Sequence, residues 1–245
     1  LVLLWPLLGA GPLVLDEHVA YWIVGPDNPG TLLERSLDVA ATPPLSFWMQ
    51  RAAITLFGES ELVFRAPSAV CYLLAIGVTF LLGRELLGDC AGALAALLVA
   101  WHPGVLDQVR IGRPYGATLF LAALAFWMTA RWKRQPQSRW TGVGWVAANG
   151  ALLWTHYVNL PAILLQFVIL TGVPRVLSRP GGPSWGRLMV AAVALVGISV
   201  PLWPSVLRIW EWSPFLNFMR TEPSFLGTLG TLWWAGLPAG WVIAW

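Results

Sequence analysis

The sequence predicts an all-α fold: a polytopic bundle of transmembrane helices with interfacial helices in its first extracytoplasmic loop. The first observation is composition, because 57% of the 245 residues are hydrophobic and 11% are charged, whereas soluble domains carry about 25% charged residues. The second is that the apolar residues form runs separated by polar, Gly-containing or Pro-containing segments. Both observations indicate an integral membrane protein.

Eight apolar runs are the expected spans. Residues 1–15 are fewer than the roughly 20 of a complete span, so we interpret this run as a truncated helix. Several others are also short, which tilted or Gly/Pro-broken helices tolerate inside a bundle. We expect about eight helices in one domain over residues 1–245, truncated at both ends. The other seven runs are Ala66 to Gly83, Ala91 to Leu106, Pro114 to Ala130, Thr141 to Thr155, Val158 to Val173, Leu188 to Leu207 and Gly227 to Trp245.

The first loop, residues 16–65, is too long and too apolar for a simple hairpin connection. Within it, Pro43 and Pro44 precede an apolar aromatic segment that ends at Gly58, and prolines are typical of a helix start. This segment is too short for the roughly 20 residues of a span. We therefore expect a helix that lies along the membrane interface.

Charge asymmetry predicts the orientation. Two connections, residues 131–139 and 175–187, carry basic residues and no acid, which places them in the cytoplasm by the positive-inside rule. Alternation of the spans then puts residues 16–65, 106–113, 156–159 and 208–226 on the opposite side, with ten of the twelve acids. Any chemistry is therefore expected at the extracytoplasmic face of a plasma (inner) membrane.

Asp16 and Glu17 are the first candidates for chemistry. They directly follow the first apolar run, and acids at the mouth of a membrane span are costly enough to require a functional reason. The alternative is that they only cap and solubilise a helix end. Both interpretations remain open on residue type alone.

Several function classes lack their motifs here. The chain has no Walker loop, no Gly-rich dinucleotide fingerprint and no Cys/His pattern at zinc spacing. The net charge of +3 comes largely from the basic loops, so we interpret it as membrane topology rather than nucleic-acid binding. Nucleotide-driven transport and a nucleic-acid partner are not expected.

Five features in a fixed order resemble the polyprenyl-phosphate-dependent glycosyltransferases of the GT-C superfamily. They are Asp16-Glu17 after the first span, Pro43-Pro44-Leu45 before an aromatic helix, Phe57 to Glu61, Arg65 to Ser68 at the start of the next span, and Arg110 to Tyr115. The resemblance is to the protein mannosyltransferase-like branch, with the aminoarabinose transferases and the RgtA/B/C/D-like enzymes. It covers about residues 10–175 and implies a GT-C-like bundle, of which this chain is the N-terminal half.

The resemblance implies a membrane enzyme that moves a sugar from a polyprenyl-phosphate carrier to a hydroxyl of a lipid, glycan or protein acceptor. In that family an acid of the first outer loop acts in catalysis, and the matching position is Asp16. A carboxylate makes the acceptor hydroxyl a better nucleophile by taking its proton. We expect Asp16 to be the base, with Glu17 orienting a neighbour or helping to hold a metal.

The leaving group in such a reaction is a polyprenyl phosphate, whose negative charge requires fixed cations. Arginine suits this role because its planar guanidinium donates two hydrogen bonds to phosphate and stays charged near lipid. Arg113 is the preferred candidate, ahead of Arg110, and Tyr115 is a further substrate-binding candidate. Extension of both side chains to lipid headgroups is the simpler alternative. Asp107 shares the loop, either as their salt-bridge partner or as an acceptor contact.

Two further residues and a metal complete the expected site. His156 lies in a tight turn, where it either bonds the substrate or satisfies backbone groups of the turn. Arg65 could bind phosphate, although pairing with Glu59 or Glu61 is favoured. His18, His102 and His156 lack the local spacing of a metal site. The expected donor is a polyprenyl-phosphate-linked sugar. The sequence predicts no other cofactor, and it does not decide whether a divalent metal binds.

The main alternative from another class is a transporter or flippase for lipid-linked sugars, in which polar residues between broken helices line a path. Against it, ionisable residues gather at one face, and the main polar residues inside the spans are Asn149 and Gln166. These two amides are expected to bond between helices. A catalytically inactive scaffold that binds lipid carriers is the third alternative.

Overall fold

The structure, a computed structural model, describes residues 12–171 and 182–212. The chain divides into two compact units, residues 1–205 and 206–245, and the elements given below belong to the first, except for residues 206–212. Helices and their connections make up both described ranges, which contain no β-strand. The expected all-α fold is confirmed.

The helices fall into two groups. Short ones occupy the expected first loop: α2 (Leu15–Val24), α3 (Leu32–Glu34), the π-helical η1 (Arg35–Val39) and α4 (Leu45–Phe57). The remaining helices follow the expected spans: α5 (Glu61–Leu87), α6 (Asp89–Trp101), α7 (Pro103–Val109), α8 (Tyr115–Arg134), α9 (Arg139–Leu153), η2 (Tyr157–Asn159), α10 (Leu160–Thr171), α11 (Trp185–Ser199), η3 (Val200–Leu202) and α12 (Trp203–Trp212). Residues 1–11 of the first expected run and all of the last lie outside the described residues.

Local signals account for the bounds of α4 and α5. Helix α4 starts after Pro44 and ends at Gly58, whose φ of 86° is a left-handed value that glycine adopts readily. Ser60 then caps α5, because its side chain accepts a hydrogen bond from the backbone N–H of Val63 at 3.2 Å. The expected separate helix in the first loop is confirmed.

Membrane-spanning length is clear for two helical segments of the described residues. Glu61–Leu87 and Trp185–Glu211 each have 27 residues and an apolar composition that suits a bilayer. Helices α6 and α7 form a third span if the pair, bent by 59°, is taken as one. The chain is therefore a polytopic helical membrane protein.

A bend between α6 and α7 divides the run that the sequence predicts as a span over residues 91–106 into two helices. His102 has an extended ψ of 115° and caps α7, accepting at Nδ1 from the N–H of Val105 at 3.3 Å. Pro103 explains the break, since proline lacks an N–H donor and disfavours the α conformation in the residue before it.

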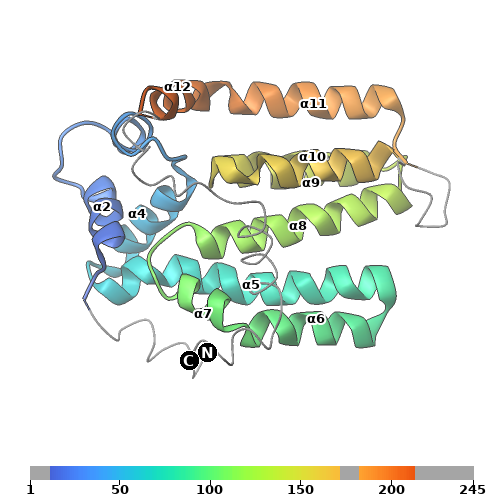
Figure 1. The fold of residues 1–245 in the computed structure, drawn as a ribbon, viewed down its shortest axis with the longest axis horizontal. Helices are drawn as coiled ribbons and strands as arrows, with labels where there is room; N and C mark the ends of the chain where they lie inside the picture. Colours follow the sequence, from blue (N-terminus) through green and yellow to red (C-terminus); the bar gives the residue numbers. More distant parts are fainter. Residues whose placement is uncertain (1–11, 172–181, 213–245) are drawn as a thin grey trace, which may run out of the picture. The chain divides into compact units, whose positions relative to one another are not determined.

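Helices α5, α6 and α8 lie side by side, with α2 and α4 at one end of them (Figure 1). Helices α5 and α6 approach very closely: a Cβ on Gly83 would lie 2.7 Å from the Cα of Gly92. Such small residues allow the tight helix contacts that are common in membranes.

Buried amides join the helices, as the sequence predicted. Asn149 on α9 donates from Nδ2 to Oε1 of Gln166 on α10 at 3.0 Å, and Thr129 on α8 lies 2.9 Å from the same oxygen. All three side chains are buried. These contacts between α8, α9 and α10 confirm the helix-packing interpretation of both amides.

Candidate functional site

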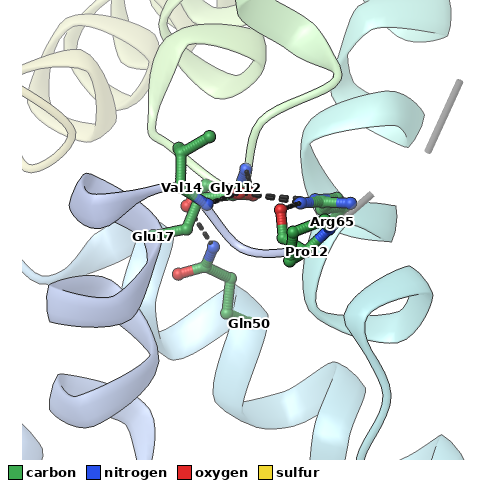
Figure 2. A network of polar contacts seen from close by, with 6 residues as sticks. All are labelled: Pro12, Val14, Glu17, Gln50, Arg65 and Gly112. Carbon is green, nitrogen blue, oxygen red and sulfur yellow. Dashed lines mark hydrogen bonds and ion pairs between the residues drawn. The ribbon is translucent and has the colours of Figure 1, made fainter. Parts of the chain in front are cut away.

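Glu17 is the centre of a buried polar network (Figure 2). Its Oε1 accepts from Nε of Arg65 at 2.8 Å and from the backbone N–H of Gly112 at 2.6 Å. Its Oε2 accepts from Nη2 of Arg65 at 2.8 Å and from the N–H of Val14 at 3.0 Å. Glu17 is 0% exposed and Arg65 is 5% exposed. Four donors thus compensate the burial of one carboxylate.

The position of Glu17 follows from the start of α2. Val14 is the N-cap residue, and Glu17 at the third helical position reaches back to its N–H. This contact is one half of a capping box. The capping interpretation of the acid pair is therefore confirmed for Glu17, although its second oxygen also binds residues far away in sequence.

The network changes the acidity of Glu17. Burial by itself raises the pKa of the carboxyl, but the hydrogen bonds from Arg65, Gly112 and Val14 outweigh it, so the pKa is lowered below 4.5. The carboxylate therefore stays ionised at neutral pH. A carboxylate with four donors is poorly placed to take a proton from a substrate.

Gly112, in the connection before α8, joins four parts of the chain. Its N–H binds Glu17 of α2, and its carbonyl accepts from Nε2 of Gln50 on α4 at 2.8 Å. A Cβ at Gly112 would lie 2.2 Å from the ring of Phe64 on α5. Glycine is therefore required here by the close approach of neighbouring groups.

Asp16 differs from Glu17 in its exposure to solvent. It is exposed and forms no hydrogen bond or ion pair with another described residue. Adjacent helical positions point about 100° apart, so one acid faces the protein while its neighbour faces outward. The base role expected for Asp16 stays a prediction, and the structure leaves its carboxylate free to meet a ligand.

The expected partner of Arg65 was wrong. The sequence favoured Glu59 or Glu61, but the ion pair is with Glu17, which lies 48 residues earlier. Glu59 and Glu61 are exposed, where water solvates a carboxylate well. A buried guanidinium gains more from a buried carboxylate, because both charges have lost their water.

In the connection that leads to α8, the two candidate arginines differ. Arg110 pairs with Asp107 at 2.5 Å, and both are about half exposed, which confirms the salt-bridge interpretation of Asp107. The side chain of Arg113 forms no hydrogen bond or ion pair with any residue in the described ranges, and its Nε is buried without a partner. Tyr115 follows as the first residue of α8 and is half-buried.

The positive charge of Arg113 affects the pKa of His156. Burial lowers the pKa of the imidazole, and the positive charge of Arg113 lowers it further. Nδ1 of His156 accepts from the N–H of Val158 at 3.3 Å at the start of η2, so the turn-stabilising interpretation is confirmed. The substrate contact stays a prediction.

Sequence reasoning missed Gln50 and Gly112 as site residues. Gln50 interrupts an apolar helix, which was a usable signal, but Gly112 stands in a polar connection where glycine is common. Among the residues that the structure describes, no group of three His, Cys, Asp or Glu side chains could hold a metal ion. A divalent metal stays untested.

Comparison with known proteins assigns the family. The family model for dolichyl-phosphate-mannose-protein mannosyltransferase matches residues 41–203, well over half of the chain. The chain belongs to this family. Within this mannosyltransferase-family chain, Arg65, Gly112, Arg113 and His156 lie inside the matched range, whereas Asp16 precedes it. No curated protein sequence matches the chain.

A solved structure has a similar fold. The crystal structure of ArnT from Cupriavidus metallidurans in the apo state aligns with a TM-score of 0.56 and 20% identity. The alignment covers 97% of this mannosyltransferase-family chain and 48% of ArnT, so the chain spans about half the length of that protein. Family and fold together confirm the resemblance to the GT-C superfamily.

Proposed function

We propose that the protein is a membrane glycosyltransferase that moves a sugar from a polyprenyl-phosphate carrier to an acceptor hydroxyl on the extracytoplasmic side. The supporting observation is that Asp16 and Arg113 each adjoin a member of one buried hydrogen bond. Asp16 precedes Glu17, whose Oε1 binds the N–H of Gly112, and Arg113 is the residue after Gly112. This link between the two segments supports the assignment of a general base and a phosphate-binding cation to one site.

The arginine partners support this assignment of Arg113. Six arginines occur in residues 16–113, and five are occupied: Arg35 with the carbonyls of residues 23, 25 and 28–30, Arg51 with that of Val24, Arg65 with Glu17, Arg84 with Asp89, and Arg110 with Asp107. Arg113 has no such partner among the described residues. A guanidinium without a protein acceptor is well suited to a phosphate, which it binds through two parallel hydrogen bonds.

In the proposed reaction, Asp16 takes the proton of the acceptor hydroxyl while its oxygen forms a bond to the anomeric carbon. The bond between that carbon and the phosphate oxygen breaks, and the polyprenyl phosphate leaves with the electron pair. Arg113 stabilises the charge that develops on the phosphate. Asp16 then releases its proton to water, which restores the carboxylate.

The Glu17–Arg65 pair has a supporting role in this proposal. Because Glu17 is saturated with donors, it holds α2, α5 and the Gly112 connection together without competing for the substrate proton. Preorganised groups of this kind reduce the cost of bringing the reacting groups into place. The lipid acceptor, glycan acceptor and protein acceptor are all compatible with the proposal.

The test is sugar transfer by the full-length protein in proteoliposomes, supplied with a mixed pool of polyprenyl-phosphate sugars. Asp16→Asn is expected to reduce transfer by about 10²- to 10⁴-fold while donor binding persists. Asp27→Asn is the matched control, because Asp27 is an exposed acid of the same loop. Movement of lipid-linked sugar across the bilayer without transfer would replace this proposal with the transporter alternative.

A further inference from the structure

Two hydrogen bonds tie α4 to distant parts of the chain. At its start, the N–H of Leu45 donates to the carbonyl of Trp154 at 3.0 Å. Further along the helix, Nε2 of Gln50 donates to the carbonyl of Gly112. Arg113 is the residue after Gly112, and His156 is two residues after Trp154. The α4 helix therefore connects the segments that carry Arg113 and His156.

Ser46 lies on the stretch of α4 between these two contact points. Because it is four residues before Gln50, it shares the helix face that meets the Gly112 connection. Side chains of a helix lean toward its N-terminus, which brings Ser46 toward the end that binds Trp154. Ser46 is 6% exposed, and its Oγ has no hydrogen-bond partner within the part of the chain that the structure describes.

Gln50 offers a second unpaired atom on this face. Its Nε2 is committed to the carbonyl of Gly112, which fixes the orientation of the amide, so that Oε1 is left as a buried acceptor without a partner. An acceptor cannot bind a phosphate oxygen, which has no proton to donate, but it can bind a sugar hydroxyl. Arg113, by contrast, presents only donors.

Together with Arg113, which follows Gly112 in sequence, the free atoms of Ser46 and Gln50 offer the mixed character that a sugar phosphate requires. An unpaired buried polar atom is costly, and a ligand that completes the hydrogen bond is one explanation for such an atom in a native protein. We propose that Ser46 and Gln50 bind hydroxyls of the donor sugar and determine sugar specificity, next to Arg113 at the phosphate. This inference rests on the proposed function and extends it to the sugar.

The test measures binding rather than turnover. Full-length protein in nanodiscs is titrated with a bare polyprenyl phosphate and with the same carrier bearing a hexose. Wild type is expected to bind the sugar-bearing carrier about tenfold more tightly, which corresponds to one hydrogen bond to a buried group. Ser46→Ala is expected to lose this preference and to leave affinity for the bare carrier unchanged.

The matched control is Ser68→Ala. Ser68 is also 6% exposed and also lacks a partner for its Oγ, but it lies on α5, next to Gly116 of α8, rather than on α4. It should keep the sugar preference. Ser46→Ala removes an unpaired hydroxyl, so the thermal stability of the empty protein should stay equal or rise. A loss of stability together with a loss of all binding would overturn the inference.

The outcomes separate the two proposals. A sugar preference that survives in Ser46→Ala while transfer continues would overturn the specificity role and leave the transferase proposal intact. A wild type without any sugar preference would also overturn the specificity role. A preference that is lost only in Ser46→Ala, in a protein that transfers no sugar, would support the sugar site and contradict the transferase.

Discussion

Glu17 and Arg65 form a bidentate buried ion pair between residues 48 positions apart: Nε and Nη2 of Arg65 each lie 2.8 Å from an oxygen of Glu17. Removing one partner of a buried pair leaves the other charge without compensation, which costs roughly 3–5 kcal/mol. We therefore expect Glu17→Gln and Arg65→Gln to lower the free energy of unfolding strongly, as measured by thermal or denaturant unfolding in detergent.

Glu59→Gln is the control for this pair, because Glu59 is exposed. It should change stability by less than about 0.5 kcal/mol.

The lowered pKa of Glu17 also makes stability depend on pH. The contribution of Glu17 to the free energy of unfolding is present above pH 4.5 and is lost as the pH falls through the lower folded-state pKa. An unchanged melting temperature in Glu17→Gln would contradict the compensating role of the four donors.

Gly112→Ala should be destabilising because its methyl group would overlap the Phe64 ring. Overpacking of this kind costs typically about 1–3 kcal/mol, and displacement of the connection would also strain the hydrogen bonds to Glu17 and Gln50. Gly77→Ala is the control, since a Cβ there meets nothing within 4 Å. Equal melting temperatures for the two variants would exclude a special requirement for glycine at position 112.

Arg113→Gln should weaken donor binding more than Arg110→Gln. Arg113 lacks a protein acceptor, whereas Arg110 already pairs with Asp107. A hydrogen bond to a charged group contributes about 1.5–3 kcal/mol, so the donor KM in Arg113→Gln should rise roughly 10- to 100-fold. A larger effect from Arg110→Gln, in the same proteoliposome assay, would reverse the assignment of the phosphate-binding residue.

His156 should make stability depend on pH below 6.5. Burial and then the charge of Arg113 lower its pKa below 6.5, so the unfolded chain binds a proton more readily than the folded protein does in this range. Stability is therefore complete above pH 6.5 and falls as the pH drops below it. Melting curves at successive pH values should show this fall in wild type and a flatter profile in His156→Gln.

The sequence by itself determined most of the secondary structure. Apolar runs predicted the helices from α5 to α11, and the Pro43-Pro44 start and Gly58 end predicted α4 as a separate helix. These features are local, because proline, glycine and hydrophobic periodicity act within a few residues. The break at Pro103 has a local cause as well, because proline disfavours the α conformation in the residue before it.

Only the tertiary structure decided which candidate residues of the site are buried and paired and which remain exposed. The sequence offered two adjacent acids and several arginines, yet which acid is buried depends on the direction in which α2 meets α5 and the Gly112 connection. Arg65 binds Glu17 although 48 positions separate them in sequence, and the N–H of Gly112 binds Glu17 from 95 positions away. Such contacts follow from helix packing and from the cost of burying unpaired charges, and no local pattern specifies them.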